Sequence, residues 1–148
     1  MDYEITRKTD GADAYYTVRW SPLTKAEKYH INASVPAMGG LAEMYWRDDH
    51  GRFHLYLLAR SHFGGLRSTL RAAVDPDVER DPARLAVLLA HEDAIWYRYA
   101  IHDMAADIQD VFYFFMTTYR PHAEPPAHSG RFDNIFVKEL DADRIVTA

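Results

Sequence analysis

The sequence contains no cysteine among its 148 residues. Disulfide bonds, thiolate nucleophiles and cysteine-ligated zinc or iron–sulfur centres are therefore excluded. No stretch approaches the roughly 18 consecutive apolar residues that identify a membrane-spanning helix. The N-terminal stretch MDYEITRKTD also has no apolar segment of the kind that signal peptides carry. We expect a soluble, cytoplasmic protein that does not contact a membrane.

Sequence motifs for common enzyme classes are missing as well. There is no P-loop, no GxGxxG following a strand, no GxSxG and no HExxH. Basic residues are fewer than acidic ones: the sequence has 17 Lys and Arg and 22 Asp and Glu, which gives a net charge of −5. A protein that coats nucleic acid through a broad positive field is thus excluded, although a local basic groove is not. No cofactor is predicted.

Apolar and aromatic residues are plentiful, at 48% and 14% of the chain. A chain of this length buries roughly 70% of the surface that its unfolded form exposes, so one core and one domain are expected. Within that domain we distinguish an N-terminal β extension over residues 1–38, a core over 39–121, and a loop with a last strand over 122–148. The 121–133 loop is rich in proline and long enough to engage a partner.

Hydrophobic periodicity predicts an α+β domain with one small mixed or antiparallel sheet and three main helices. Strand 53–60 is apolar on both faces by strict alternation, so we expect it in the centre of the sheet. Asp103 is expected to cap the last helix, and its run from Val111 to Met116 is expected to be deeply buried. The predicted strands cover residues 3–7, 14–20, 41–46, 53–60, 94–101 and 134–140, and the helices cover 66–74, 81–93 and 104–119, with a weaker helix starting near Thr24.

In the order of their predicted elements and in several short sequence segments, residues 36–121 resemble the GIY-YIG endonuclease domain. The segment PAMGGLAEMYW stands where that family has its GIY strand, and LYLLARS stands where it has its YIG strand. GGLRSTLR takes the place of the helix with the catalytic arginine, and DIQDVFYFFMTTYRP takes the place of the helix with the metal-binding glutamate. The resemblance implies a GIY-YIG-like core preceded by a β-hairpin.

The resemblance also implies that the family's chemistry is lost. Ala42 and Leu57 stand at the positions of the two tyrosines, and Thr69 stands at the position of the arginine. Phe112 occupies the place of the glutamate, and a phenyl ring cannot hold Mg²⁺. Hydrolysis by the family mechanism is therefore not expected, and no catalytic residue is assigned.

A local basic patch follows strand 53–60. Arg67 and Arg71 are one helical turn apart, and Arg60 ends the preceding strand. With the backbone amides of Gly64 and Gly65 at a helix N-terminus, these arginines form a candidate site for phosphate or another anion. The alternative is that they pair with surface carboxylates such as Asp77 and Glu79.

Two further sets of residues have a functional and a structural interpretation. Asp103, Asp107 and Asp110 share one helix face, which fits either a weak Mg²⁺ site or a solvated acidic stripe. Tyr45 and Tyr56, on adjacent strands, fit either base stacking in single-stranded nucleic acid or packing in the core.

Three functions remain open at this point. The first is a non-catalytic GIY-YIG-like binding module whose basic patch takes an anionic ligand, a nucleic acid or a protein partner. The second is a metal-dependent nuclease or phosphodiesterase with a rewired site, which requires the acidic stripe to face the arginines. The third is a structural protein that forms homo-oligomers through the edge strands of the N-terminal hairpin or of NIFVKEL.

Overall fold

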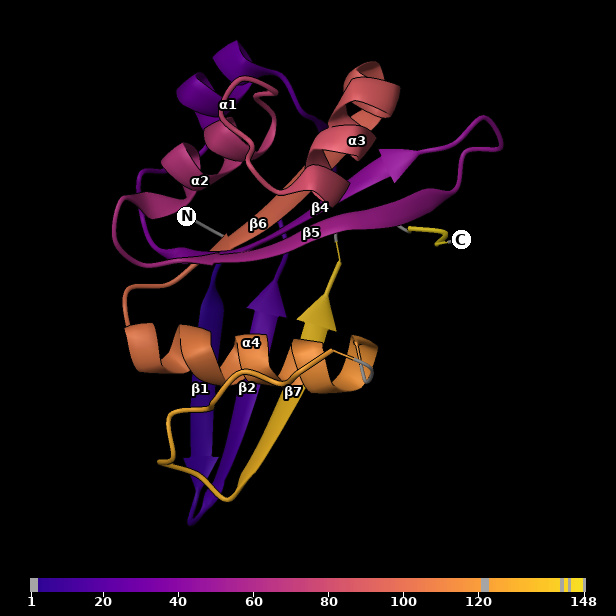
Figure 1. Cartoon of the computed structure of the whole chain (residues 1–148). Coiled ribbons are helices and arrows are strands. Elements are labelled where there is room, and N and C mark those ends of the chain that lie inside the picture. The colour runs from indigo at the N-terminus through magenta and orange to yellow at the C-terminus, as the bar shows by residue number, and fades with distance from the viewer. Residues whose placement is uncertain (1–2, 121–122, 142, 144, 148) are drawn as a thin grey trace.

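The computed structural model describes residues 3–120, 123–141, 143 and 145–147. Over these residues the chain forms four α-helices and two sheets, one of three strands and one of four (Figure 1). The α+β class is confirmed, whereas the expectation of a single sheet is wrong. None of the helices in the described ranges combines the length and the apolar character needed to cross a membrane.

The four-stranded sheet is antiparallel and has β4 and β6 at its centre. Its order is β3 (Thr24–Lys25), β6 (Ile95–Ile101), β4 (Gly40–Arg47) and β5 (Phe53–Ser61). The prediction that residues 53–60 form a central strand is therefore wrong, because β5 lies at an edge. Both faces of β5 are apolar because both faces of the sheet are covered by other elements. An edge strand is covered in this way as much as a central strand.

A β-bulge shifts the faces of β5. Met44 pairs with Leu57 and Tyr45 pairs with Leu55, so Tyr56 is an extra residue without a partner on β4. Tyr56 and Leu57 consequently both pack into the core beneath the helices, while Leu58 packs on the opposite face. Strict alternation of side chains along this strand, as the sequence suggested, does not hold.

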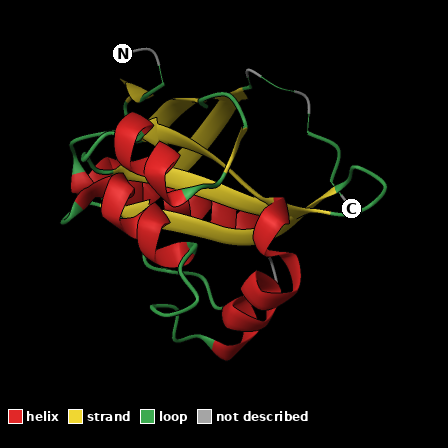
Figure 2. Ribbon diagram, turned by 90° about the horizontal axis from the view of Figure 1, so that it is seen from above, coloured by secondary structure: helices red, strands yellow, loops and turns green. Residues whose placement is uncertain are grey.

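Three helices cover one face of the four-stranded sheet (Figures 1 and 2). They are α1 (Lys28–Ser34), α2 (Gly65–Ala73) and α3 (Pro82–His91), followed by the 3₁₀ turn η1 (Glu92–Ala94). The side chain of Asp81 accepts a hydrogen bond from the Arg84 amide at 3.0 Å, and Pro82 opens α3. The predicted start of this helix is thus confirmed by its cap.

Of the N-terminal extension, the first two strands build a second sheet, while the short β3 extends the first. Strands β1 (Ile5–Asp10) and β2 (Asp13–Arg19) form an antiparallel hairpin through Gly11, and β7 (Asn134–Leu140) pairs with β2 in parallel. The order β1-β2-β7 makes the first and last strands of the chain the two outer strands of this sheet.

Helix α4 (Ala105–Tyr119) lies between the two sheets (Figure 1). Its buried Ile108, Val111 and Phe115 join a core with the inner face of the three-stranded sheet and with residues of β4 and β6. Only this side of the helix is buried, so the expectation that the whole run 111–116 is deeply buried is wrong. Asp103 is not the cap either, since Met104 holds that position without a side-chain hydrogen bond.

Gly40 starts β4 where two strands approach closely. A Cβ atom at this position would lie 2.1 Å from the carbonyl oxygen of Ala100, whereas one at Gly11 would meet nothing within 4 Å. We expect Gly40→Ala to lower the free energy of unfolding by about 3 kcal/mol or more, since neighbouring backbone must shift. Gly11→Ala, at a φ of +58°, is expected to cost about 1 kcal/mol. Urea unfolding of both variants measures this difference, and equal losses would contradict it.

Candidate functional site

A cavity of about 490 Å³ opens where the C-terminal end of α4 meets strands of both sheets. Its size falls within the range of roughly 300–1,000 Å³ that is typical of small-molecule sites. Strands β4, β5, β6 and β7, helix α4 and the segment after β7 all contribute side chains. The lining residues are Glu43, Tyr45, Leu55, Leu58, Arg98, Phe115, Tyr119, Arg120, Glu139, Asp141, Asp143, Ile145 and Thr147.

Arg98 on β6 is the buried centre of this cavity, with only 7% of its surface exposed. Its Nε donates to Glu43 Oε1 at 2.9 Å and its Nη2 donates to the same oxygen at 2.6 Å. The guanidinium also pairs with Asp141 and lies 3.7 Å from Glu139. Its carbon stands 4.7 Å from the centroid of the Trp20 ring, so both charge and aromatic contact hold it in place.

Hydroxyl and indole groups donate hydrogen bonds to the carboxylate oxygens of Glu43 and Glu139. The Tyr45 hydroxyl donates to Glu43 Oε2 at 2.9 Å. On the other wall, the Tyr119 hydroxyl donates to Glu139 Oε2 at 2.7 Å and Trp20 Nε1 donates to Glu139 Oε1 at 2.8 Å. The side chains of Arg98, Glu43 and Glu139 are therefore held in place by the protein itself, as a pre-organised binding site requires.

Burial and hydrogen bonds shift the pKa values of the acidic groups in the cavity. Burial and the neighbouring carboxylate raise the pKa of the Tyr45 phenol, and burial with the hydrogen bond to Glu139 does the same for the pKa of Tyr119. Burial also raises the pKa of Glu43, and the guanidinium of Arg98 offsets part of that rise. Both phenols thus stay protonated at neutral pH and act as hydrogen-bond donors.

The charge of the lining is negative overall. Four carboxylates face two guanidinium groups, which leaves a difference of two negative charges. Between these polar groups lie apolar side chains, which give the cavity an amphipathic wall. The carboxylates are Glu43, Glu139, Asp141 and Asp143, the guanidinium groups are Arg98 and Arg120, and the apolar residues are Leu55, Leu58, Phe115 and Ile145.

The structure does not gather the three arginines of the predicted basic patch. Arg67 on α2 donates its Nε to the Val35 carbonyl at 2.8 Å, and Arg71, one turn later, lies near Asp75. Arg60 points to the opposite face of the sheet, where its guanidinium carbon stands 4.7 Å from the ring centroid of Phe112 on α4. Helices α2 and α4 cover different faces, so Arg60 is separated from the other two (Figure 1).

The other predicted anion-binding groups are partly engaged within the protein. Gly64 and Gly65 adopt φ values of +81° and +78° at the start of α2, and the next amide, that of Leu66, already donates to the Met38 carbonyl at 2.8 Å. Tyr56 is 8% exposed and its hydroxyl donates to the Ala73 carbonyl, so it is a core residue. Tyr45 is also buried, but it lines the cavity described above.

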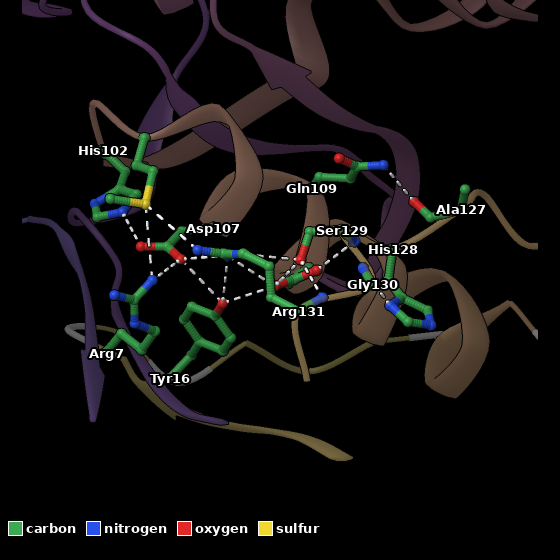
Figure 3. Close-up of polar contacts among 12 residues, drawn as sticks. Arg7, Tyr16, His102, Asp107, Gln109, Ala127, His128, Ser129, Gly130 and Arg131 are labelled. Carbon is green, nitrogen blue, oxygen red and sulfur yellow. Dashed lines mark hydrogen bonds and ion pairs between the residues drawn. The ribbon is translucent and has the colours of Figure 1, made fainter. Parts of the chain in front are cut away.

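The acidic stripe is a buried ion-pair network (Figure 3). Asp107 and Asp110 are 3% and 0% exposed, so the expectation of a solvated stripe is wrong for these two residues, whereas Asp103 is exposed and precedes α4. Their partners come from β1, β2, the turn before α4 and the loop before β7. These partners are Arg7, Tyr16, His102, Ser129 and Arg131.

Arg131 connects both aspartates and fastens the loop to α4. Its Nη2 donates to Asp107 Oδ1 at 2.7 Å and to Asp110 Oδ2 at 2.9 Å. The Ser129 amide adds a hydrogen bond to Asp110 Oδ1 at 2.7 Å. Within the predicted partner-binding loop, Ser129 and Arg131 are thus anchored to α4, while residues 121 and 122 lie outside the described residues.

A metal-dependent nuclease site is not supported by this placement. The aspartates face Arg7 and Arg131 rather than the arginines of α2, and the described residues contain no group of three or more His, Asp or Glu side chains arranged to hold a metal ion. One feature of the sequence indicates that Asp107 and Asp110 are buried. Asp107 and Asp110 share a helix face with apolar Ile108 and Val111, so the stripe had an apolar side.

A protein-family model described as "Uncharacterised protein" matches residues 4–148. No curated protein and no solved structure matches the chain.

The ion-pair network around Asp107 makes the free energy of unfolding depend on pH. Burial by itself raises the pKa of Asp107, but hydrogen bonds from Arg131, His102 and Arg7 outweigh it and hold the pKa below the usual 3.8. A carboxylate with a lowered pKa stabilises the fold above the pKa of the unfolded chain, and this contribution is lost as pH falls through the lower folded pKa. We therefore expect the free energy of unfolding to drop below about pH 4.

Urea unfolding between neutral pH and pH 3 measures this loss. Asp107→Asn is expected to weaken the fold at neutral pH and to flatten its acid dependence. The matched control is Asp103→Asn, which removes an exposed carboxylate outside the helix. An acid dependence in Asp107→Asn as steep as that of the wild type would contradict the assignment.

Proposed function

The chain belongs to the family that this uncharacterised-protein model describes, and from the geometry of the cavity we propose that it is a non-catalytic binding domain for a small amphipathic cation. The observation that carries the proposal is the cavity between the two sheets, with the hydrogen-bonded ion pair of buried Arg98 and Glu43 in its lining. Cavities that combine apolar walls with a few fixed polar groups are the usual form of small-molecule sites.

The charge of the cavity selects the sign of the ligand. Because Arg98 is already paired with Glu43 and Asp141, an incoming carboxylate would meet surplus negative charge. An ammonium or guanidinium group instead finds carboxylate oxygens at the polar end, among them those of Asp141 and Asp143. A positively charged ligand is therefore favoured over a negatively charged one of equal size.

The walls of the cavity select the shape of the ligand. Leu55, Leu58 and Phe115 line the cavity with apolar surface. The rings of Tyr45 and Tyr119 add aromatic surface next to Glu43 and Glu139, to which their hydroxyls donate. A ligand with an aryl or alkyl body and a terminal amine matches this arrangement. Burying the body contributes roughly 25 cal/mol per Å² of apolar surface, and the amine sets the orientation.

The proposal is tested by comparing two probes of matched body and opposite charge. Isothermal titration calorimetry with 2-phenylethylamine and with 3-phenylpropanoate is expected to show binding of the amine at least about tenfold tighter, which corresponds to about 1.4 kcal/mol. Leu58→Trp fills the cavity and is expected to abolish binding of the amine. Leu89→Trp is the control, because Leu89 lies on α3 and is 64% exposed.

Two results would contradict the cavity proposal. One is equal or tighter binding of the acid probe, and the other is unchanged amine binding by a folded Leu58→Trp. Variants of Arg98 are less suitable, because removing one member of a buried ion pair typically destabilises a protein by about 3–5 kcal/mol. Loss of binding in such a variant would not separate the site from the fold.

We also propose, from the resemblance, that residues 39–121 are a GIY-YIG-like core without nuclease activity. The order β4, β5, α2, α3, β6, α4 follows the family's order of elements and supports this proposal. At the positions of the family's catalytic groups, Ala42 is buried and the Thr69 hydroxyl donates to the Gly65 carbonyl at 3.2 Å. Phe112 lies under Arg60, on the other side of the sheet from Thr69.

Plasmid DNA incubated with the purified protein and Mg²⁺ or Mn²⁺ is accordingly expected to stay uncut. Cleavage that requires the metal and disappears in Arg67→Ala would contradict this expectation. The plasmid assay and the calorimetric titration use the same preparation of folded protein.

A further inference from the structure

The outer face of the three-stranded sheet carries an exposed aromatic pair. Tyr15 on β2 and Phe136 on β7 are 45% and 46% exposed, and their rings are stacked with centroids 5.1 Å apart and planes 15° apart. Helix α4 covers the other face of this sheet (Figure 1), where Tyr16 and Val18 are buried. The pair therefore presents aromatic surface to solvent from the middle strand β2 and the edge strand β7.

Positively charged side chains flank the pair in the register of the sheet. Lys8 on β1 stands opposite Tyr15, and Phe136 stands opposite Tyr15 on the other side. In the next row Lys138 stands opposite Thr17, and Arg19 lies one row further along β2. Lys8, Arg19 and Lys138 are all exposed and form no ion pair with another described residue.

The acidic residues of this face lie at its two ends, with Glu4 beside Arg19 at one end, where the Arg19 amide donates to the Glu4 carbonyl at 3.0 Å, and the others at the hairpin turn. Asp10 and Asp13 form the last row beside the hairpin turn, and the Asn134 side chain donates to Asp13 Oδ1 at 2.8 Å. The rows around the aromatic pair are thus positive, although the chain as a whole has a net charge of −5. This local reversal of sign is the charge complementarity that a polyanion requires.

We propose that this outer sheet face, formed by Lys8, Tyr15, Arg19, Phe136 and Lys138, binds single-stranded nucleic acid. The two rings stack on each other, Lys8 flanks Tyr15 on β1, and β7 is an edge strand, so no further strand of the sheet limits the access of a base to Phe136. Base stacking on aromatic side chains together with cations along the backbone is how sequence-tolerant single-strand sites work. The surface is separate from the cavity, on the other side of β7 from Glu139.

Fluorescence anisotropy with labelled oligo-uridine, oligo-thymidine and a DNA duplex tests the proposal at several salt concentrations. The two single strands are expected to bind, and the duplex is expected to bind more weakly because its bases are not free to stack. Three cations that contact phosphates predict a salt slope of about −2 for single strands. No binding of either single strand at low salt would overturn the proposal.

Two pairs of variants separate stacking from charge, each with a matched control. Tyr15→Ser/Phe136→Ser is expected to raise the Kd at least about tenfold, whereas Tyr29→Ser/Phe63→Ser removes one Tyr and one Phe that are 82% and 92% exposed elsewhere. Lys8→Gln/Lys138→Gln is expected to reduce the salt slope to about −0.7. Its control, Lys25→Gln/Lys28→Gln, removes the same charge far from this face.

The alternative occupant of the face is a second copy of the chain, and light scattering distinguishes it. A wild-type protein that is monomeric and loses oligonucleotide binding only in the Tyr15/Phe136 and Lys8/Lys138 variants supports the proposal. A dimer that becomes monomeric in Tyr15→Ser/Phe136→Ser would overturn it. Equal loss of affinity in test and control variants would also overturn it. The outcome is independent of the amine titration, because Leu58→Trp leaves this face unchanged.

Discussion

The burial of Asp107 and Asp110 on α4 is the constraint on which the arrangement of the two sheets depends. A buried carboxylate is stable only with charge and hydrogen bonds supplied by its neighbours. Here these come from β1, from β2 and from the loop before β7, through Arg7, Tyr16 and Arg131. Each of these elements is thereby tied to one helix. The same helix packs its apolar residues against the four-stranded sheet, so that α4 fixes both sheets in one unit.

A second ionic cluster stands at the other end of α4 and shapes the cavity. Arg98 comes from the four-stranded sheet, while Glu139 comes from the three-stranded sheet and is held by Tyr119 of α4. Three separate elements thus meet through one carboxylate. Arg98, Glu43 and Glu139 pair with one another or with neighbouring hydroxyl and indole groups, and the cavity lies beside them. The ion pairs at the two ends of α4 therefore have different consequences. At one end they fasten strands and a loop to the helix, and at the other end they line a cavity.

Strand β7 connects the two surfaces to which we assign ligands. Its side chains alternate, so that Ile135, Val137 and Glu139 face α4 and the cavity while Phe136 and Lys138 face outward. Strand β7 pairs in parallel with β2 and lies at an edge of the three-stranded sheet. A strand of seven residues can in this way line an interior site and an exterior one without either contacting the other.

The sequence by itself determined the local elements. Alternation and caps placed β2, β6, β7 and α3 close to their observed bounds, since these signals depend on neighbouring residues alone. What only the tertiary structure decided was how distant elements meet. The bulge at Tyr56, the edge position of β5 and the separation of Arg60 from Arg67 follow from pairing across the chain. Arg131 and Asp107 are 24 residues apart, and periodicity carries no information on contacts over that distance.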